Sequence, residues 1–410
     1  MKINNSFPNY KIRNNRQITF LPRHSSNENR EGEKFLLYSP VSHYNMQAVK
    51  VAFMGKNFRK ENSKHNENHY IGCMVGTAIG DAFGAPIEFL KLSKIKKLYG
   101  AEGLTYLTPS RTGKISFTDD TQLAIFTADG LLKSAVKNSN IAAEPNYSTV
   151  YNSYRNWYKV CTQNMKVDDG WVTDIDKMYG RQRYGSTCME VLSQDNYGSI
   201  EEPINNSKGS GGVMRSAPIG LMYYKTPEKS FKIAAKCAAL THGNPNGYLS
   251  AGVYASIISY LINGNTIQDS IDKAMNLLSR EVNGDELYML LNKAKKLAGE
   301  DIEPTEAVKQ LGLGWDGDEA LAIAVYSVLK TPNDFQQVLV NACNHDGDSD
   351  TVGSIAGGIM GTYLGYDGIP NEFKEKVELE NELKDLACDL LTNPKKIKQR
   401  KRRYPIQKKV

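Results

Sequence analysis

The feature that most constrains the fold is a glycine repeat in the run from residue 70 to residue 90. Four glycines recur there at every fourth position: Gly72, Gly76, Gly80 and Gly84. Residues four apart lie on one face of an α-helix, and each glycine costs a helix about 1 kcal/mol relative to alanine. The repeat therefore predicts a helix whose bare face lies against another backbone. Pro86 cannot occupy a helix interior, so the helix should end near Gly84 and leave Glu88 just beyond its C-terminus.

Further stretches with helical spacing of apolar residues follow along the chain. We expect helices over 122–136, 148–161, 227–240, 248–261, 267–281, 285–297, 318–329, 335–343, 351–364 and 379–390. Strand-like alternation is nearly absent, and no repeat with the period of roughly 20–50 residues that marks a solenoid is visible. The pattern predicts one all-α domain over residues 67–393. The segment 180–212 is long for a loop in such a domain, which is typical of functional or disordered loops.

The composition excludes several classes of protein. The longest apolar run, residues 252–262, is interrupted by Ser and Tyr and is far shorter than the roughly 18 residues that a membrane span needs. Residues 1–20 lack the apolar core of a secretory signal. The 6 cysteines are widely spaced, without CxxC pairs, which favours reduced, buried thiols over disulfides, a zinc site or a thiol nucleophile. We therefore expect a cytoplasmic protein without a membrane segment.

The net charge of +6 is distributed unevenly along the chain. Residues 1–66 hold 12 Lys or Arg and 4 Asp or Glu, and residues 394–410 hold 9 basic residues and no acidic one. The segment 67–393 holds 30 basic and 41 acidic residues and carries a charge of −11. An acidic centre argues against a nucleic-acid groove and fits a site of carboxylates that holds divalent cations.

The two basic ends are interpreted as additions to the domain. Residues 1–66 are predicted to form a loosely structured arm, and its aromatic stretch 35–44 could dock on the core or on a partner. Residues 394–410 are interpreted as a basic, solvated C-terminal tail. The alternative for this tail is a nucleic-acid or nuclear-import patch.

Two clusters of Asp and Thr directly precede predicted helices. They are Thr118, Asp119, Asp120 and Thr121, and then Asp346, Asp348, Asp350 and Thr351. Such residues commonly cap a helix, yet capping needs only one of them, and concentrated carboxylates repel one another unless cations neutralise them. Ligand sets made only of oxygen suit Mg²⁺. The second cluster lacks the Gly and Glu of an EF-hand loop, so that site is excluded.

A third element is the glycine-rich segment 209–215. Its backbone amides could bind a phosphate, although a plain turn explains the same glycines. The segment has neither the Lys-Ser/Thr of a Walker A motif nor a strand-linked GxGxxG, which excludes those nucleotide sites. His242 lies among turn-forming residues, where it could hydrogen-bond to a ligand or serve only the fold.

Five motifs together resemble the ADP-ribosylglycohydrolase family, whose type member is the dinitrogenase-reductase-activating glycohydrolase. They are GDAFGAPIEF at Gly80, FTDDTQ at Phe117, GSGGVMR at Gly209, THGNP at Thr241 and DGDSDTVGSIAGGIMGTYLG at Asp346. The resemblance covers about residues 70–368 in the family's order. It implies a single-domain orthogonal multi-helix bundle with a binuclear metal site for two Mg²⁺ or Mn²⁺ ions. The arm and the tail have no counterpart in the family's minimal domain.

The resemblance also implies roles for single residues. The implied metal ligands are Thr118, Asp119, Asp120, Asp348, Asp350 and Thr351. Glu88 resembles the family's active-site glutamate, and Asp119 and Asp350 would also serve catalysis. The diphosphate and ribose pocket would contain Ser210, Gly211, Gly212 and Met214, with His242 near the ligand. Ser210 stands where family members commonly have Asn.

These implications define one leading function and two alternatives. The leading hypothesis is a hydrolase that removes ADP-ribose from a modified side chain of a protein substrate, with arginine as the acceptor. An acidic pocket would stabilise the positive, oxocarbenium-like transition state of this reaction. The first alternative is an immunity or antitoxin-type protein that neutralises an ADP-ribosyltransferase toxin through residues 1–66, with or without hydrolase activity. The second is a centre retained only for binding or structure.

Overall fold

The predicted glycine face belongs to a helix that covers residues 66–84. A computed structural model describes residues 66–109, 116–179, 184–391 and 403–405, which all belong to one compact unit, Asn57–Val410. The chain turns over residues 85–89 directly after this helix. The predicted helix end near Gly84 is therefore confirmed, and Glu88 lies in the turn that follows.

The partner of helix 66–84 is α14 (Ser349–Leu364). A Cβ atom added to Gly76 would lie 2.3 Å from the carbonyl oxygen of Gly357, and one added to Gly357 would lie 2.2 Å from that of Gly76. The same reciprocal contact joins the pairs Gly72–Gly361 and Gly80–Gly353. The pairs run in opposite directions along the two helices, so the helices are antiparallel. The predicted backbone contact is confirmed, and it places the turn with Glu88 beside the N-terminus of α14.

The remaining described elements are also helical. The α-helices are, in chain order, α2 (Leu92–Tyr99), α3 (Asp119–Asn138), α4 (Tyr147–Trp157), α5 (Ser186–Leu192), α6 (Ala217–Met222), α7 (Pro227–Ala239), α8 (Pro245–Ile262), α9 (Ile267–Leu278), α10 (Asp285–Ala298), α11 (Pro304–Leu311), α12 (Gly317–Lys330), α13 (Phe335–Cys343), α15 (Asn371–Lys374) and α16 (Glu380–Leu390). A π-helical turn covers Tyr158–Thr162, and 3₁₀ turns cover Trp171–Asp174, Asp176–Met178, Ser210–Gly212 and Tyr366–Gly368. The described residues contain no β-strand, only an isolated bridge between Gly209 and Asp316. The all-α fold class is confirmed.

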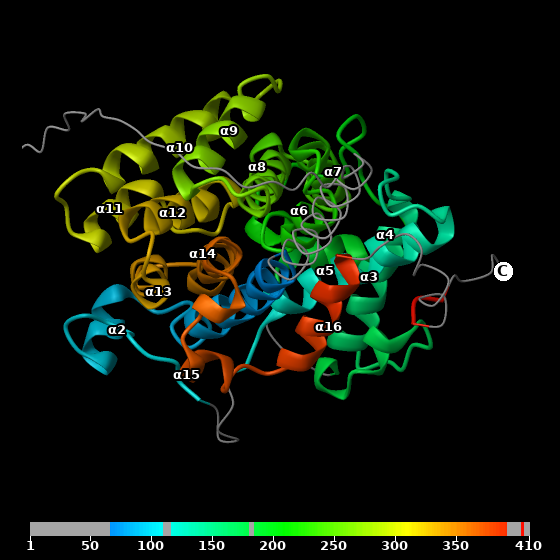
Figure 1. The fold of residues 1–410 in the computed structure, drawn as a ribbon, viewed down its shortest axis with the longest axis horizontal. Coiled ribbons are helices and arrows are strands. Elements are labelled where there is room, and N and C mark those ends of the chain that lie inside the picture. The colour runs from blue at the N-terminus through cyan, green and yellow to red at the C-terminus, as the bar shows by residue number, and fades with distance from the viewer. Residues whose placement is uncertain (1–65, 110–115, 180–183, 392–402, 406–410) are drawn as a thin grey trace, which may run out of the picture. The chain divides into compact units, whose positions relative to one another are not determined.

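Helix α8 lies at the centre of this arrangement, and nearly all of its residues are buried. It packs against α6, α7, α9, α12 and α14, as expected for a helix that is apolar on all sides. Figure 1 shows α9, α10 and α11 on one side of this centre, and α3, α4 and α16 on the other. Helix α14 contacts α3 and α12 as well as α8. Helix α14 is therefore held from several directions.

The structure differs from the sequence-based helices at particular points. Helix α3 begins at Asp119, three residues before the predicted start, because Thr118 caps it and both acidic residues fall in its first turn. The segment 180–212 is not a plain loop, since it contains α5 and a 3₁₀ turn, although residues 180–183 lie outside the described part. Helices α2, α5, α6, α11 and α15 were not predicted. Each has eight residues or fewer, which leaves too few repeats for the periodicity to show.

The chain ends fall largely outside the described residues. These exclude 1–65 of the predicted arm, and 392–402 and 406–410 at the other end. Within the predicted tail, Tyr404 is fully buried and its hydroxyl donates to Asp389 of α16 at 2.6 Å. The guanidinium of Arg403 lies 3.9 Å from the ring centre of Trp171. Residues 403–405 therefore pack on the core and are not a solvated terminus, while the predicted division into arm, domain and tail stays a prediction.

None of the helices in the described part of the chain is long and apolar enough to cross a membrane.

Candidate active site

A cavity of about 460 Å³ lies where the first turns of α3 and α14 face each other. The hydroxyl of Thr351 in α14 reaches Oδ2 of Asp120 in α3 at 3.4 Å. The predicted site residues that line the cavity are Glu88, Asp119, Asp120, Ser210, Gly211, Met214, His242, Asp348, Asp350 and Thr351. Two predicted residues, Thr118 and Gly212, do not line it. The structure thus brings together residues from all five motifs, while the roles of these residues stay predictions.

The acidic turn of α3 is held by Asp81, a residue that sequence reasoning did not single out. Asp81 follows Gly80 on helix 66–84 and is fully buried. Its carboxylate accepts hydrogen bonds from the backbone N–H and the hydroxyl of both Thr118 and Thr121. Burial raises the pKa of Asp81, and these hydrogen bonds oppose that rise. The Thr118 hydroxyl, predicted to be a metal ligand, donates to Asp81 at 2.8 Å, so Asp81 orients the turn that carries Asp119.

The acidic turn of α14 carries the second group of carboxylates. Asp348 caps α14 by accepting from the backbone N–H of Thr351, and its Oδ2 accepts from the Ser210 hydroxyl at 2.8 Å. One carboxylate oxygen from each of Glu88, Asp348 and Asp350 lies within 4.8 Å of the others. The antiparallel glycine contact explains this convergence, because it sets the end of one helix beside the start of the other.

Asp346 belongs to the same sequence motif but faces elsewhere. Its carboxylate accepts from the backbone N–H of Leu92 at 2.5 Å and lies 3.4 Å from the Lys91 ammonium. It therefore holds the start of α2, and it does not line the cavity.

The carboxylates of the cavity are buried close together, which makes their charged forms costly. Burial raises the pKa of Asp119 to about 7 and that of Asp348 to about 6. Burial also raises the pKa values of Asp120 and Asp350 well above the usual range, and neighbouring carboxylates raise them further. Oδ1 of Asp120 is buried and has no hydrogen-bond partner among the described residues. A donor set of carboxylate and hydroxyl oxygens with such a free acceptor fits hard divalent cations such as Mg²⁺ or Mn²⁺.

The glycine-rich turn Ser210–Gly212 forms another wall of the cavity. Its N-terminus has no side-chain cap, and the amide of Ser210 donates to the carbonyl oxygen of Trp315 at 3.0 Å. A Cβ atom added to Gly211 would lie 3.0 Å from Cε1 of His242, so the turn lies directly on the imidazole ring. Gly212 instead faces the core, where an added Cβ would lie 3.0 Å from Cβ of Ala238.

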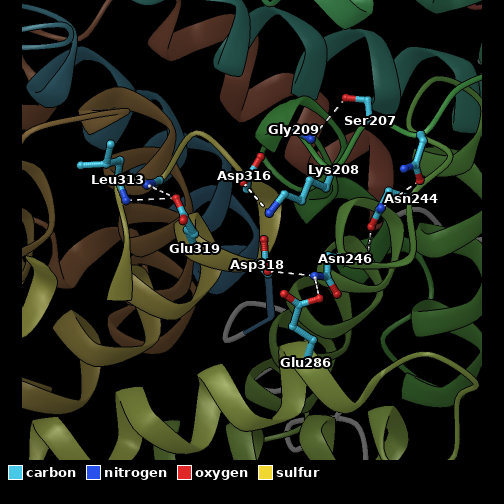
Figure 2. Close-up of polar contacts among 12 residues, drawn as sticks. Ser207, Lys208, Gly209, Asn244, Asn246, Glu286, Leu313, Asp316, Asp318 and Glu319 are labelled. Atoms are coloured by element: carbon cyan, nitrogen blue, oxygen red, sulfur yellow. Dashed lines mark hydrogen bonds and ion pairs between the residues drawn. The ribbon is translucent and has the colours of Figure 1, made fainter. Parts of the chain in front are cut away.

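Behind this turn, polar contacts fix it to the neighbouring helices (Figure 2). The Lys208 ammonium pairs with Asp316 at 2.9 Å. The side-chain amide of Asn246 in α8 donates to Asp318 of α12 at 3.0 Å and to Glu286 of α10 at 2.8 Å. These contacts hold Lys208, which directly precedes the turn, and join α8 to α12, which both pack against the turn. They so fix the position from which Ser210 reaches Asp348.

The mouth of the cavity has an aromatic rim. The rings of Phe89 and Trp315 stack with their centres 5.1 Å apart, and both side chains are exposed, at 66% and 38%. Both residues line the cavity. Phe89 has a φ of 65°, a left-handed conformation that is sterically costly for a bulky side chain. Phe89 ends the motif GDAFGAPIEF, but nothing in the sequence links it to Trp315, so this rim was not predicted.

Known proteins share the sequence pattern and the fold of this chain. The sequence profile of the ADP-ribosylglycohydrolase family matches residues 62–399. The chain belongs to the ADP-ribosylglycohydrolase family. This confirms the resemblance of the five motifs and the prediction that the chain is an enzyme of this family.

Relatives of this ADP-ribosylglycohydrolase include two named enzymes. ADP-ribosylarginine hydrolase Tri1 of Serratia proteamaculans is 25% identical over 326 residues, which cover 78% of each chain. ADP-ribosylhydrolase ARH3 of Mus musculus is 26% identical, with 79% of this chain and 91% of the relative covered. A solved ADP-ribosylglycohydrolase-related protein complex has the same fold, with a TM-score of 0.53, 22% identity, and coverage of 80% of this chain and 98% of the other.

Proposed function

We propose that this ADP-ribosylglycohydrolase is a metal-dependent hydrolase that removes ADP-ribose from modified arginine side chains of proteins and so reverses mono-ADP-ribosylation. The observation that carries the proposal is a cavity that joins buried carboxylates from two helix N-termini to a glycine-rich turn. The relative named ADP-ribosylarginine hydrolase supports arginine as the acceptor.

The carboxylates form the side of the cavity where the metal ions would bind. Asp119, Asp120, Asp348, Asp350 and Thr351 would hold the cations, with Thr118 at the edge of the group. When bound, the two Mg²⁺ or Mn²⁺ ions would act as Lewis acids that lower the pKa of water and orient the ribose hydroxyls. The negative charge of the cluster stabilises the positive charge that develops on the ribose ring.

Glu88 has a separate place in this proposal. It is half-buried in the turn after helix 66–84, and its carboxylate reaches the Asp348 and Asp350 group. From there it can orient the substrate or accept a proton at its carboxylate oxygen. Ser210 and Gly211 of the glycine-rich turn line the same cavity, where they would contact the diphosphate and ribose.

The test is release of free ADP-ribose from proteins that carry arginine-, serine- or aspartate-linked ADP-ribose. We expect release from the arginine-linked protein, and a loss of at least about 100-fold on chelation or in the double variant Asp119→Asn with Asp350→Asn. Asp346→Asn is the matched control, because Asp346 shares the motif but lies outside the cavity, and it should retain activity. Release that survives both chelation and the double variant would exclude the metal mechanism. Preferential release from the serine-linked protein would exclude arginine specificity.

The two alternatives remain predictions. The immunity or antitoxin function depends on residues 1–66, of which 1–65 lie outside the described residues. Deleting residues 1–60 separates it from hydrolysis, because loss of protection against a toxin with unchanged release of ADP-ribose would favour the arm. A centre that only binds would retain ADP-ribose without releasing it from any of the three linkages.

A further inference from the structure

Arg215 is a buried cation that follows the glycine-rich turn. It is 1% exposed, and no Asp or Glu among the described residues forms an ion pair with it. Its guanidinium lies 4.1 Å from the ring centre of Tyr154, and one nitrogen donates to the Thr241 hydroxyl at 2.7 Å. The aromatic face and neutral hydrogen-bond partners offset part of the cost of burying this charge. A positive charge thus lies behind a cavity whose other ionised groups are carboxylates.

Thr241 connects Arg215 to His242 through hydrogen bonds to both side chains. A guanidinium can only donate, so the Thr241 oxygen accepts from Arg215 and keeps one proton to donate. Two acceptors are within reach of that proton: Nδ1 of His242 at 2.8 Å and the carbonyl oxygen of Ala238 at 3.4 Å. Donation to Ala238 would leave the hydroxyl proton only a 3.4 Å contact, whereas donation to His242 uses the 2.8 Å contact, so the better hydrogen bond has Nδ1 as the acceptor. In a neutral ring the proton then lies on Nε2.

The charge on Arg215 favours the same tautomer. Burial and Arg215 lower the pKa of His242 to about 3, so the ring is neutral at physiological pH. Nδ1 and the guanidinium both contact the Thr241 hydroxyl, so the positive charge favours a lone pair on Nδ1 and leaves the proton on Nε2.

Nε2 of His242 faces the glycine-rich turn. A Cβ atom added to Gly211 would lie 3.1 Å from Nε2, and one added to Gly209 would lie 3.7 Å from it. His242 lines the cavity, and its ring hydrogen bond to another described residue is made by Nδ1, not Nε2. The ring therefore presents an unused N–H donor beside the turn.

We propose that Arg215 and Thr241 are positioning residues that fix His242 as an Nε2–H donor for a phosphate oxygen of the bound nucleoside diphosphate. This inference rests on the proposed function in one respect only, the identity of the ligand. A diphosphate carries negative charge into a cavity with buried carboxylates, and the N–H of His242 and the charge of Arg215 offset that repulsion on the side of the turn.

The first test reads the tautomer directly, without ligand or metal. Long-range nitrogen-15 to proton NMR spectra of the full chain report which ring nitrogen is protonated, and His242→Gln identifies the signals among the 6 histidines. We expect a protonated Nε2 in the wild-type chain and in Thr241→Ser. Thr241→Val removes the hydroxyl at nearly constant volume, but the charge of Arg215 still favours a protonated Nε2; the double variant Thr241→Val with Arg215→Met removes both and should raise the population of the Nδ1-protonated form. Protonation at Nδ1 in the wild-type chain, or an unchanged tautomer in the double variant, would overturn the proposal.

The second test is calorimetric binding of free ADP-ribose to the same full-length variants. We expect Thr241→Val to weaken binding about 10-fold and Thr241→Ser to leave it within about 2-fold, as for loss of one hydrogen bond to a charged group. Arg215→Met should weaken binding further, and Arg215→Lys should restore part of it. Equal dissociation constants for wild type and Thr241→Val would overturn the ligand contact. If ADP-ribose binds to no variant, the proposed function fails, while the tautomer measurement still decides the positioning roles.

Discussion

Replacing Gly76 with alanine should force apart the two helix backbones on which the site depends. The added Cβ would lie 2.3 Å from the carbonyl oxygen of Gly357, and within 3.1 Å of Cα of Gly361. An ordinary contact begins near 3.4 Å, so the helices must separate locally by about 1 Å, and neither atom belongs to a side chain that can rotate away. Overpacking of this kind costs about 1–3 kcal/mol, while alanine favours the helix by about 1 kcal/mol.

Because two backbones must move, the overpacking cost should lie at the upper end of this range, about 3 kcal/mol. After the helix gain of about 1 kcal/mol, we expect Gly76→Ala to lower the free energy of unfolding by about 2 kcal/mol, measured by urea denaturation with circular dichroism. Gly299→Ala is the control, because Gly299 is exposed, has a φ of −86°, and an added Cβ there would lie 3.6 Å from the nearest oxygen. It should change the stability by less than about 0.5 kcal/mol. A Gly76→Ala protein as stable as the wild type would refute the close backbone contact.

Three further predictions concern single carboxyl and aromatic groups. The raised pKa of Asp119, about 7, means that the folded metal-free protein binds this proton more tightly than the unfolded chain. The contribution of Asp119 to stability is therefore present below about pH 4 and is lost as the pH rises to about 7. Urea unfolding between these pH values should show that the free energy of unfolding falls less for Asp119→Asn than for the wild type. Asp81→Asn should weaken Mn²⁺ binding about 10- to 100-fold although Asp81 does not line the cavity, and unchanged affinity would refute its orienting role. Tyr404→Ala should lower the free energy of unfolding by about 3 kcal/mol, because this side chain is fully buried; no loss of stability would show that residues 403–405 do not pack on the core.

Local spacing in the sequence predicted the parts of the site that depend on one segment. The glycine repeat predicted a bare helix face, and the acidic clusters predicted carboxylates at helix starts, because both depend on residues a few positions apart. The partner of the glycine face was not predicted, although Gly353, Gly357 and Gly361 repeat at the same spacing. Matching these two repeats would have paired the helices and placed Glu88 beside Asp350.

Other features depend on side-chain geometry that spacing does not contain. Asp81 is a single acidic residue in a glycine-rich motif, and only its contacts with Thr118 and Thr121 reveal its role. The chain of contacts from Arg215 through Thr241 to His242 likewise depends on how three side chains meet in the core. Gly212 was predicted by its place in a motif, and the local 3₁₀ turn directs it toward the core instead.

The most direct test of the central claim is the number of divalent cations that the full chain binds. We predict that titration with Mn²⁺, followed by electron paramagnetic resonance, will show two bound ions per chain for the wild type and for Asp346→Asn. Asp120→Asn and Asp350→Asn should each lose at least one of them. Absence of Mn²⁺ binding by the wild type, or equal binding by all four proteins, would contradict the assignment of the acidic cavity as a metal centre.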